Sequence, residues 1–457
     1  MNGQNPREIA ARVLGQRKAG GEFTENLLDR ALSGARLSPA DRGLCQELVY
    51  GVVRWQAALD WLIARKTGGR EQRTGLQNLL RLGLYQIFWL DRIPPHAAVH
   101  ETVELAKHGG FGQQAGFINA ILRGYLREAD ATRKLLADLK ATDPATGCSH
   151  PEWLVARWQK HFGADKTAQL LEWNNTPPKT FARVNTLKFR EGRRVGVPNQ
   201  QEQSGTATRR PSQNENAGDL LAQWHQENVD YDFVRRDWLE ENLVFELKSH
   251  PSLNSLASFR GGWFYVQDPG TLLAPRELGA QPGETVLDLC AAPGGKTTYL
   301  AQLMNNDGKI VACDISEERL KLIRENCARL GVTCVETTQN SKLKTQNLKF
   351  DRILVDAPCS NTGVLRRRVD LRWRISAPEI SRLQQAQLEL FKFAATKLKP
   401  GGVLVYSTCS LEPEENSEVV KKFLAAHSNF KLETERALLP FADNVDGAYI
   451  ARLKNTT

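Results

Sequence analysis

Apolar residues in the first third of the chain recur at helical spacing. Between residues 6 and 140 they return every three or four positions, which is the period of an amphipathic helix. One such run consists of Leu76, Leu79, Leu80, Leu84 and Ile87. This pattern predicts an all-α domain over residues 1–140.

The middle of the chain mixes helical and strand-like patterns. Small and polar residues at 142–150 predict a linker, after which Pro151 begins a further helical segment. Apolar and polar side chains alternate along residues 181–187, as they do in a half-buried strand. Shorter strand-like pieces follow at 243–245 and 263–268.

These pieces together predict a small α+β module over residues 150–265. Within it, residues 191–217 are polar and contain few apolar side chains. Such a composition does not supply a packed core, so we predict a flexible insertion there and assign it no function.

From Gln281 onward, apolar runs of strand length alternate with helical patterns, which is typical of a doubly wound parallel sheet. Strands are expected at 285–289, 309–313, 334–338, 350–356 and 403–407. Helices are expected at 297–304, 317–330, 378–398 and 413–426. The sequence Pro400-Gly401-Gly402 predicts a sharp turn into the last strand. The fold predicted for residues 266–457 is therefore α/β and Rossmann-like.

Composition and charge narrow the class of protein. With 457 residues and 41% hydrophobic content, the chain can bury a large core, which excludes a disordered or fibrous protein. The formal net charge is +9, and residues 1–140 contain 20 Lys or Arg against 14 Asp or Glu. This surplus favours a polyanionic partner such as RNA, although the solvated faces of an ordinary helix bundle explain it about as well.

Cysteine and histidine positions do not indicate a metal site or disulfides. Eight cysteines lie at irregular spacing without a Cys-x-x-Cys pair, which is typical of a reducing cytosol. His96 and His100 lie four apart on a predicted helix, but no third ligand is near them, so capping or packing is favoured over metal binding. The N-terminus lacks an apolar signal core, and no apolar stretch approaches the roughly 18 residues that span a membrane. We expect a cytoplasmic monomer without a metal or a membrane segment.

Two short sequence motifs end apolar segments that are predicted as strands: Asp356-Ala357-Pro358-Cys359-Ser360 and Ser407-Thr408-Cys409-Ser410. A thiolate is the side chain best suited to add to an electron-poor pyrimidine ring. A lone cysteine at a strand end is usually a small buried apolar residue, but both cysteines here are expected at the carboxyl edge of the sheet, where ligands bind. The pair predicts a cytosine methyltransferase, with Cys290 as the competing nucleophile.

Two further side chains are expected in the same pocket. Asp356 stands three residues before Cys359 and can accept a hydrogen bond from an exocyclic amine, which selects cytosine over uracil. Lys296 can complement charge at the pocket floor, and a solvent-facing lysine at a helix start is an equal alternative.

A Gly-rich loop is expected between the first strand of this domain and its helix, in the string Leu287-Asp288-Leu289-Cys290-Ala291-Ala292-Pro293-Gly294-Gly295-Lys296-Thr297. Glycines there let a ligand approach the backbone closely. A phosphate-binding loop would need glycine at Cys290, and the dinucleotide pattern G-x-G-x-x-G is absent. Asp314, at the end of the next strand, can accept the ribose hydroxyls of an adenosine cofactor or instead cap a helix. The loop and the acid together fit S-adenosylmethionine.

These strings resemble the motifs of the RNA cytosine-5 methyltransferases. The resemblance is carried by residues 287–297, 356–364, 407–410 and 413–416. The front half is similar to the antitermination-factor NusB fold, through residues 47–54, 82–86 and 117–123. Together these stretches point to the bacterial Sun/Fmu group, which methylates one cytosine of small-subunit ribosomal RNA.

The resemblance implies a class I methyltransferase domain that uses S-adenosylmethionine, preceded by a NusB-like domain that binds RNA. It also implies that Cys409 attacks the ring and that Cys359 acts in product release. Cofactor contacts are implied for Cys290, Ala291, Ala292, Pro293, Gly294, Gly295, Lys296, Asp314 and Asp356.

Four stretches depart from the family pattern. Thr338-Gln339-Asn340 stands where relatives have a Gly-Asp pair, so we expect the carbonyl oxygen of Asn340 to replace the carboxylate at the adenine amine. The other departures are at 268–270, 366–370 and 446–449. A non-catalytic RNA-binding or ribosome-assembly factor is therefore the alternative to an enzyme. An ATPase, which rests only on Gly295-Lys296-Thr297, is less favoured.

Overall fold

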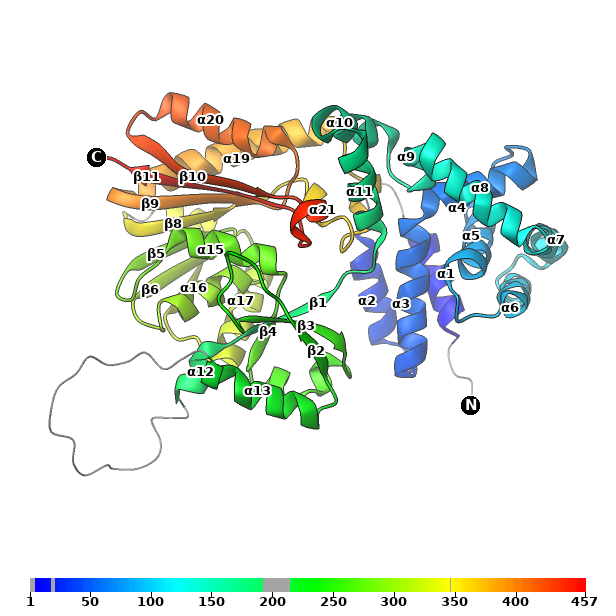
Figure 1. Ribbon diagram of the computed structural model, residues 1–457, viewed down its shortest axis with the longest axis horizontal. Coiled ribbons are helices and arrows are strands. Elements are labelled where there is room, and N and C mark those ends of the chain that lie inside the picture. Colours follow the sequence, from blue (N-terminus) through cyan, green and yellow to red (C-terminus); the bar gives the residue numbers. More distant parts are fainter. Residues whose placement is uncertain (1–4, 18–20, 192–213, 346) are drawn as a thin grey trace. The chain divides into compact units, whose positions relative to one another are not determined.

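The computed structural model describes residues 5–17, 21–191, 214–345 and 347–457, which form two compact units (Figure 1). The first unit comprises the chain up to Pro177 together with Leu365–Ile375, and the second comprises Pro178–Val364 and Ser376–Thr457. The finer division into three domains, with boundaries near 140–150 and 265, stays a prediction. Among the described residues, no helix combines the length and the apolar character that a membrane crossing requires.

The described part of the first unit contains helices and no strands, which confirms the all-α prediction. The helices are α1 (Pro6–Gln16), α2 (Thr24–Ser33), α3 (Pro39–Arg54), α4 (Gln56–Thr67), α5 (Thr74–Trp89), α6 (Pro95–His108), α7 (Ala115–Arg127), α8 (Ala129–Thr142), α9 (Pro144–Gly147), α10 (Glu152–Phe162) and α11 (Ala164–Asn175), with the 3-10 turns η1 (Gly112–Gln114) and η5 (Leu371–Trp373). The predicted apolar run lies on α5, where Leu80 and Leu84 are fully buried. Its period therefore marks the face that packs into the core.

The predicted linker at 142–150 is wrong, because this stretch is folded. Asp143 caps the short helix α9 by accepting a hydrogen bond from the backbone nitrogen of Thr146 at 3.2 Å. Ser149 is fully buried, and its hydroxyl oxygen accepts a hydrogen bond from the backbone nitrogen of Ala58 at 2.9 Å. Small polar residues here satisfy backbone groups inside the unit, which composition alone does not distinguish from a linker.

The segment Leu365–Ile375 belongs to the first unit although the sequence around it belongs to the second. Its anchor is Arg372, which is fully buried. The guanidinium donates to the carbonyl oxygens of Arg54, Ser149 and Asn174 at 3.0–3.3 Å and to Oδ1 of Asn175 at 2.8 Å. Burial, and to a smaller extent the neighbouring Arg54, lowers the pKa of Arg372 to about 9. Neither the composition nor the periodicity of residues 365–375 predicts this placement.

The second unit begins with a four-stranded antiparallel sheet of order β2-β3-β1-β4. Its strands are β1 (Thr180–Val184), β2 (Asp230–Phe233), β3 (Val244–Ser249) and β4 (Phe264–Val266), with helices α12 (Thr186–Glu191), α13 (Asn214–Gln226) and α14 (Ala257–Arg260) and the turn η2 (Leu253–Ser255). Strands are confirmed at the three predicted places, although β1 ends at Val184, before α12 begins at Thr186, and β4 covers only Phe264–Val266. Of the predicted insertion at 191–217, residues 192–213 lie outside the described residues, and residues 214–217 are helical instead of irregular.

The larger sheet of the second unit has seven strands in the order β10-β11-β9-β8-β5-β6-β7 (Figure 1). Its strands are β5 (Thr285–Leu289), β6 (Lys309–Asp314), β7 (Val335–Gln339), β8 (Phe350–Asp356), β9 (Leu398–Thr408), β10 (Phe430–Leu438) and β11 (Ala448–Asn455). Strands β9, β8, β5, β6 and β7 run parallel to one another, β11 runs antiparallel to β9, and β10 runs antiparallel to β11. The Rossmann-like prediction is confirmed, whereas β10 and β11 were not predicted.

Helices cover both faces of this sheet. They are α15 (Leu273–Leu278), α16 (Gly295–Leu303), α17 (Glu317–Leu330), α18 (Asn340–Thr345), α19 (Ala377–Lys397), α20 (Ser417–Ala426) and α21 (Pro440–Asp443), with the turns η3 (Pro269–Leu272), η4 (Thr362–Val364) and η6 (Pro413–Glu415). Successive residues of β5 enter different cores: Val286 packs with Leu300 of α16, and Leu287 packs with Phe391 of α19. Strands buried on both faces explain the continuous apolar runs in the sequence.

Two local predictions for this sheet need correction. Pro400-Gly401-Gly402 does not separate the helix from the strand, because β9 already begins at Leu398 and passes through the turn, with Gly401 at φ 67°. The helix expected at 413–426 is interrupted at Asn416, whose φ and ψ of −114° and −108° leave η6 before it and α20 after it. Asn416 lies a few residues after the motif at 407–410, whereas Pro400-Gly401-Gly402 lies at the opposite end of β9.

We predict that Arg372→Met destabilises the first unit. The substitution leaves several buried acceptors without a donor, which costs about 3 kcal/mol. Thermal unfolding followed by circular dichroism should show a lower melting temperature. Arg368→Met, at an exposed position of the same segment, is the matched control and should leave the melting temperature unchanged. Equal melting temperatures for the two variants would contradict the anchoring role.

Candidate active site

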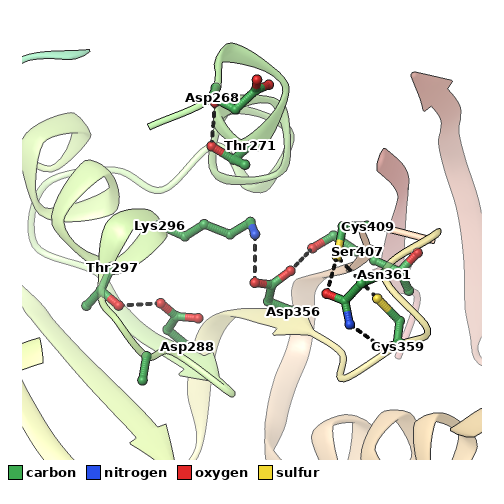
Figure 2. Close-up of polar contacts among 12 residues, drawn as sticks. Asp268, Thr271, Asp288, Lys296, Thr297, Asp356, Cys359, Asn361, Ser407 and Cys409 are labelled. Carbon is green, nitrogen blue, oxygen red and sulfur yellow. Dashed lines mark hydrogen bonds and ion pairs between the residues drawn. The ribbon is translucent and has the colours of Figure 1, made fainter. Parts of the chain in front are cut away.

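The two predicted cysteines come together at the carboxyl edge of the large sheet. Strands β8 and β9 are parallel neighbours, with Asp356 opposite Ser407. Each strand is followed within three residues by a cysteine, and the sulfur atoms of Cys359 and Cys409 lie 3.4 Å apart (Figure 2). The sheet register therefore places two thiols in one site.

The environments of the two thiols differ. Cys359 is 8% exposed, whereas Cys409 is only half-buried. The hydrogen bond with Cys409, then burial, then the charges of Cys409 and Glu415 raise the pKa of Cys359 well above its ordinary value. Cys359 is therefore a protonated thiol at neutral pH in the resting protein.

Asn361 connects the two cysteines. Its Oδ1 accepts a hydrogen bond from the sulfur of Cys409 at 3.0 Å, and its Nδ2 donates to the carbonyl oxygen of Cys359 at 2.6 Å (Figure 2). The residue has φ 59°, a left-handed conformation that asparagine tolerates better than most residues. The side chain therefore fixes the position of the more accessible thiol.

Lys296 and Asp356 form an ion pair beside the thiols. Nζ of Lys296 lies 2.6 Å from Oδ2 of Asp356, and the hydroxyl of Ser407 donates to Oδ1 at 2.8 Å (Figure 2). Burial opposes the charge of Lys296, but Asp356 outweighs it and raises the pKa of the ammonium, with smaller contributions from Cys409 and Asp288. The side chain of Lys296 is 18% exposed, which argues against the alternative of a solvent-facing lysine.

A buried carboxylate, for which no role was predicted from the sequence, holds both cysteine loops. Glu415 is fully buried and touches the residue that follows each cysteine. Its Oε1 accepts from the backbone nitrogen of Ser360 at 2.8 Å, and its Oε2 accepts from the hydroxyl of Ser410 at 2.5 Å. The Ser360 hydroxyl also donates to Oε2, and Gln387 donates to Oε1 at 3.0 Å. Glu415 thus fixes the separation of the two loops.

The Gly-rich loop follows β5 in the same sheet. Cys290 has φ 61° and Gly294 has φ 99°, so the chain reverses sharply between the strand and α16. A Cβ on Gly294 would also lie 3.3 Å from Cα of Ile323 in α17. Burial, followed by the charges of Asp356, Asp314 and Asp288, raises the pKa of the Cys290 thiol to about 12. Such a thiol is a poor nucleophile, which weakens Cys290 as the competitor of Cys409.

Buried polar side chains of β1 and β5 hold the start of α16, where this loop ends. Arg183 of β1 donates to the carbonyl oxygen of Gly295 at 2.8 Å and to the hydroxyl of Thr298 at 3.0 Å. Asp288 accepts from the hydroxyl of Thr297 at 2.6 Å (Figure 2). Burial raises the pKa of Asp288 to about 7. Neither Arg183 nor Asp288 was assigned a role from the sequence, because both lie inside apolar runs and look like ordinary strand positions.

Asp314 lies at the end of β6, as predicted, but its acceptor positions are filled. The carboxylate accepts from the backbone nitrogens of Ala292 and Ile315 at 2.9 and 2.8 Å. Arg319 donates to it through Nε at 2.6 Å and through Nη2 at 3.3 Å. The alternative of a helix cap is wrong, because Ser316 caps α17. A ribose would have to displace Arg319, whose side chain is 48% exposed.

Asn340 lies at the start of α18, directly after β7. Within the described part of the chain, its Oδ1 is buried and has no hydrogen-bond partner. A buried acceptor without a donor is costly unless a ligand supplies one. This orphaned oxygen fits the predicted contact with an adenine amine.

Three family models match the chain. The model of 16S rRNA methyltransferase RsmB/F matches residues 275–454, and the NusB family matches residues 4–127. A ferredoxin-like domain of RsmF/B-like methyltransferases matches residues 150–193.

Curated relatives extend the likeness over nearly the whole chain. The chain is 34% identical to the probable ribosomal RNA small subunit methyltransferase B of Bacillus subtilis (strain 168), over 94% of this chain and 90% of that protein. It is also 34% identical to the ribosomal RNA small subunit methyltransferase B of Escherichia coli O1:K1 / APEC, over 98% of each chain. The solved structure of a methyltransferase homolog protein from Pyrococcus horikoshii is 30% identical, with a TM-score of 0.55, over 68% of this chain and 98% of that chain.

We predict that Glu415→Ala releases the two cysteine loops. The substitution leaves the Ser360 nitrogen and two serine hydroxyls without their acceptor, at a cost of about 2–4 kcal/mol. Alkylation of Cys359 by iodoacetamide, followed by peptide mass spectrometry, should become at least tenfold faster, and the melting temperature should fall. Glu418→Ala, in the first turn of α20, is the control. Unchanged alkylation of Cys359 would show that Glu415 does not hold the site.

Proposed function

The chain belongs to the RsmB/F family of 16S rRNA methyltransferases, and we propose that it methylates carbon 5 of a cytosine in small-subunit ribosomal RNA. The proposal rests on one observation above all, the 3.4 Å separation of the Cys359 and Cys409 sulfurs at the carboxyl edge of the sheet. An intact thiol pair favours an enzyme over a non-catalytic assembly factor. We expect the enzyme to act as a monomer in the cytoplasm.

The thiol pair suits the chemistry of this position. Carbon 5 of cytosine is a poor nucleophile until a thiolate adds at carbon 6, which makes carbon 5 an enamine carbon. Carbon 5 then takes the methyl group, a base removes its proton, and the electron pair of that C–H bond restores the ring double bond as the thiolate leaves. Two sulfurs in contact can divide the addition and the proton removal between them.

The environments of the sulfurs support the assignment of roles. Cys409 is the more exposed and is held by Asn361, so we assign it the attack on carbon 6. Cys359 is kept protonated by its neighbour and by burial. When the sulfur of Cys409 is bonded to the ring, the hydrogen bond with Cys409 and the charge of that residue no longer raise the pKa of Cys359. Cys359 can then ionise and remove the carbon 5 proton, which permits product release.

Asp356 and Lys296 are assigned to recognition of the base. The carboxylate of Asp356 can accept from the exocyclic amine of cytosine, where uracil has a carbonyl oxygen instead. Lys296 at 2.6 Å and Ser407 at 2.8 Å orient that carboxylate. The pair therefore favours cytosine over uracil at the target position.

The residues that would hold S-adenosylmethionine are the Gly-rich loop at 290–296, Asp314 for the ribose, Asn340 for the adenine amine and Asp356. The orphaned Oδ1 of Asn340 supports this fit. When bound there, the cofactor would supply the electrophilic methyl group. Arg319 must leave Asp314 before the ribose hydroxyls can reach that carboxylate.

We predict that Cys409→Ala abolishes covalent capture of RNA that contains 5-fluorocytidine. Fluorine at carbon 5 cannot be removed as a proton, so the normal enzyme should stay bonded to the RNA after methyl transfer. Denaturing gels should show a shifted band for the wild type and for the control Cys334→Ala, at a cysteine directly before β7, and none for Cys409→Ala. A shifted band with Cys409→Ala would remove Cys409 as the nucleophile.

We predict that Cys359→Ala accumulates enzyme bonded to unmodified RNA in the presence of S-adenosylmethionine. Without the second thiol the carbon 5 proton is removed slowly, so the covalent complex persists and survives on a denaturing gel. The double variant Cys359→Ala/Cys409→Ala is the control and should form no complex. If Cys359→Ala turned over normally without accumulating a complex, the proposed release role would be wrong.

A further inference from the structure

The two thiols of the candidate site also have the contact that a disulfide requires. The sulfur atoms of Cys359 and Cys409 lie 3.4 Å apart (Figure 2). All eight cysteines lie within the described residues, and no other two sulfurs among them are in hydrogen-bond contact. The methyl-transfer steps use the two sulfurs as separate thiols, so a bond between them is a further property of the site.

The other six cysteines are poor targets for oxidation. Burial raises the pKa of each of these thiols, to about 11 at Cys45 and Cys148, to about 12 at Cys290, Cys313 and Cys327, and above the ordinary value at Cys334. The thiolate is the form of cysteine that reacts with peroxides. An oxidant should therefore leave these six thiols reduced.

Cys409 is the thiol of the pair that solvent reaches. It is half-buried, whereas Cys359 is 8% exposed. A site that admits a pyrimidine ring to Cys409 also admits hydrogen peroxide, which is smaller. Cys359 is kept protonated and is a poor nucleophile toward peroxide, but it lies in contact with the sulfur that becomes oxidised. Redox-sensing proteins combine an accessible thiol with a second, resolving thiol in this way.

Formation of the bond requires only a small movement. The two sulfurs must approach from 3.4 Å to the disulfide length of about 2.0 Å, which is a displacement of about 1.4 Å. Rotation of a cysteine side chain about its Cα–Cβ bond moves the sulfur by this amount while the backbone stays in place. The hydrogen bond from Cys409 to Asn361 has to break. Glu415 holds the residue that follows each cysteine, so its contacts can persist in the oxidised protein.

We propose that hydrogen peroxide joins Cys359 and Cys409 in a reversible disulfide, which makes this pair a redox-modification site. The thiolate of Cys409 attacks one peroxide oxygen, the O–O bond breaks, and the second oxygen leaves as water with the proton that Cys409 had lost. Cys409 is then a sulfenic acid. The sulfur of Cys359 attacks the sulfenic sulfur, the S–O bond breaks, and a second water leaves with the thiol proton of Cys359. Two thiols are thus oxidised to one disulfide, and one peroxide is reduced to two waters.

The disulfide stops methyl transfer, a consequence that rests on the proposed function. Neither sulfur of the oxidised pair can add to carbon 6 of cytosine, so oxidised protein does not bond to RNA. The bond also spares Cys409 from the sulfinic acid, which is irreversible. A dithiol reductant restores both thiols by exchange. Transient disulfides of this kind are the type that occurs in reducing compartments.

Peptide mapping of the full chain tests whether the bond forms. Reduced protein receives an equimolar amount of hydrogen peroxide, is denatured in iodoacetamide, and is digested and analysed by mass spectrometry without a reductant. The peptides that contain Cys359 and Cys409 should be joined, with the loss of two hydrogen atoms, and the other cysteines should be alkylated. Cys334→Ala is the matched control and should form the same bond. Alkylation of both Cys359 and Cys409, or a bond from either of them to another cysteine, would overturn the proposal.

Cys359→Ser tests the role of the resolving thiol. Under excess peroxide, oxidised Cys409 has no partner in this variant and should become the sulfinic acid, two oxygen atoms heavier. Covalent capture of 5-fluorocytidine RNA should fall by at least about tenfold on oxidation of either protein, and dithiothreitol should restore it for the wild type alone. Full recovery of capture by oxidised Cys359→Ser would contradict the role of Cys359.

The disulfide and the methyl transfer fail in different experiments, because peptide mapping involves no RNA. If reduced wild type captures no RNA while the joined peptides appear, the methyl-transfer proposal is wrong and the redox site stands. If capture succeeds and the joined peptides do not appear, the redox site is wrong and methyl transfer stands.

Discussion

The pairing of β8 with β9 is the constraint on which the site depends. Parallel register sets Asp356 opposite Ser407, and the backbone nitrogen of Ala357 still donates to the carbonyl oxygen of Ser407 at 2.9 Å beyond the last pair. After the end of each strand, the chain reaches the cysteine within three residues. Glu415 closes the arrangement by binding the serine that follows each cysteine. Two thiols are thereby brought within 3.4 Å, where the hydrogen bond with Cys409 raises the pKa of Cys359.

The 3.4 Å separation of the two sulfurs matters for the proposed methyl transfer, because each sulfur takes a different step. In the resting protein Cys409 helps to keep Cys359 protonated, so a single sulfur is available for addition. When Cys409 bonds to the ring, it no longer raises the pKa of Cys359. Cys359 can then remove the carbon 5 proton. The Lys296–Asp356 pair lies at the end of the same strand β8. Base recognition and sulfur chemistry therefore share one sheet edge, and Asn361 connects the loops across it.

Much of this arrangement could be predicted from sequence because strand periodicity and strand ends are local properties. The runs ending at Leu289 and Asp356 gave the strand bounds directly, and parallel strands place their carboxyl ends together. Glu415 could not be assigned in this way, because its function depends on a helix break at Asn416 that propensity does not show. The placement of Arg372 in the first unit likewise depends on contacts with residues near 54, 149 and 175, which lie far away in sequence.

The most direct test of the central claim is to identify the sulfur that bonds to RNA in the unaltered enzyme. Wild-type protein is incubated with S-adenosylmethionine and RNA containing 5-fluorocytidine, digested with protease and nuclease, and analysed by mass spectrometry. The account predicts a methylated fluorocytidine adduct on the peptide that contains Cys409, with Cys359 recovered as a free thiol. An adduct on Cys359 or Cys290 would contradict it.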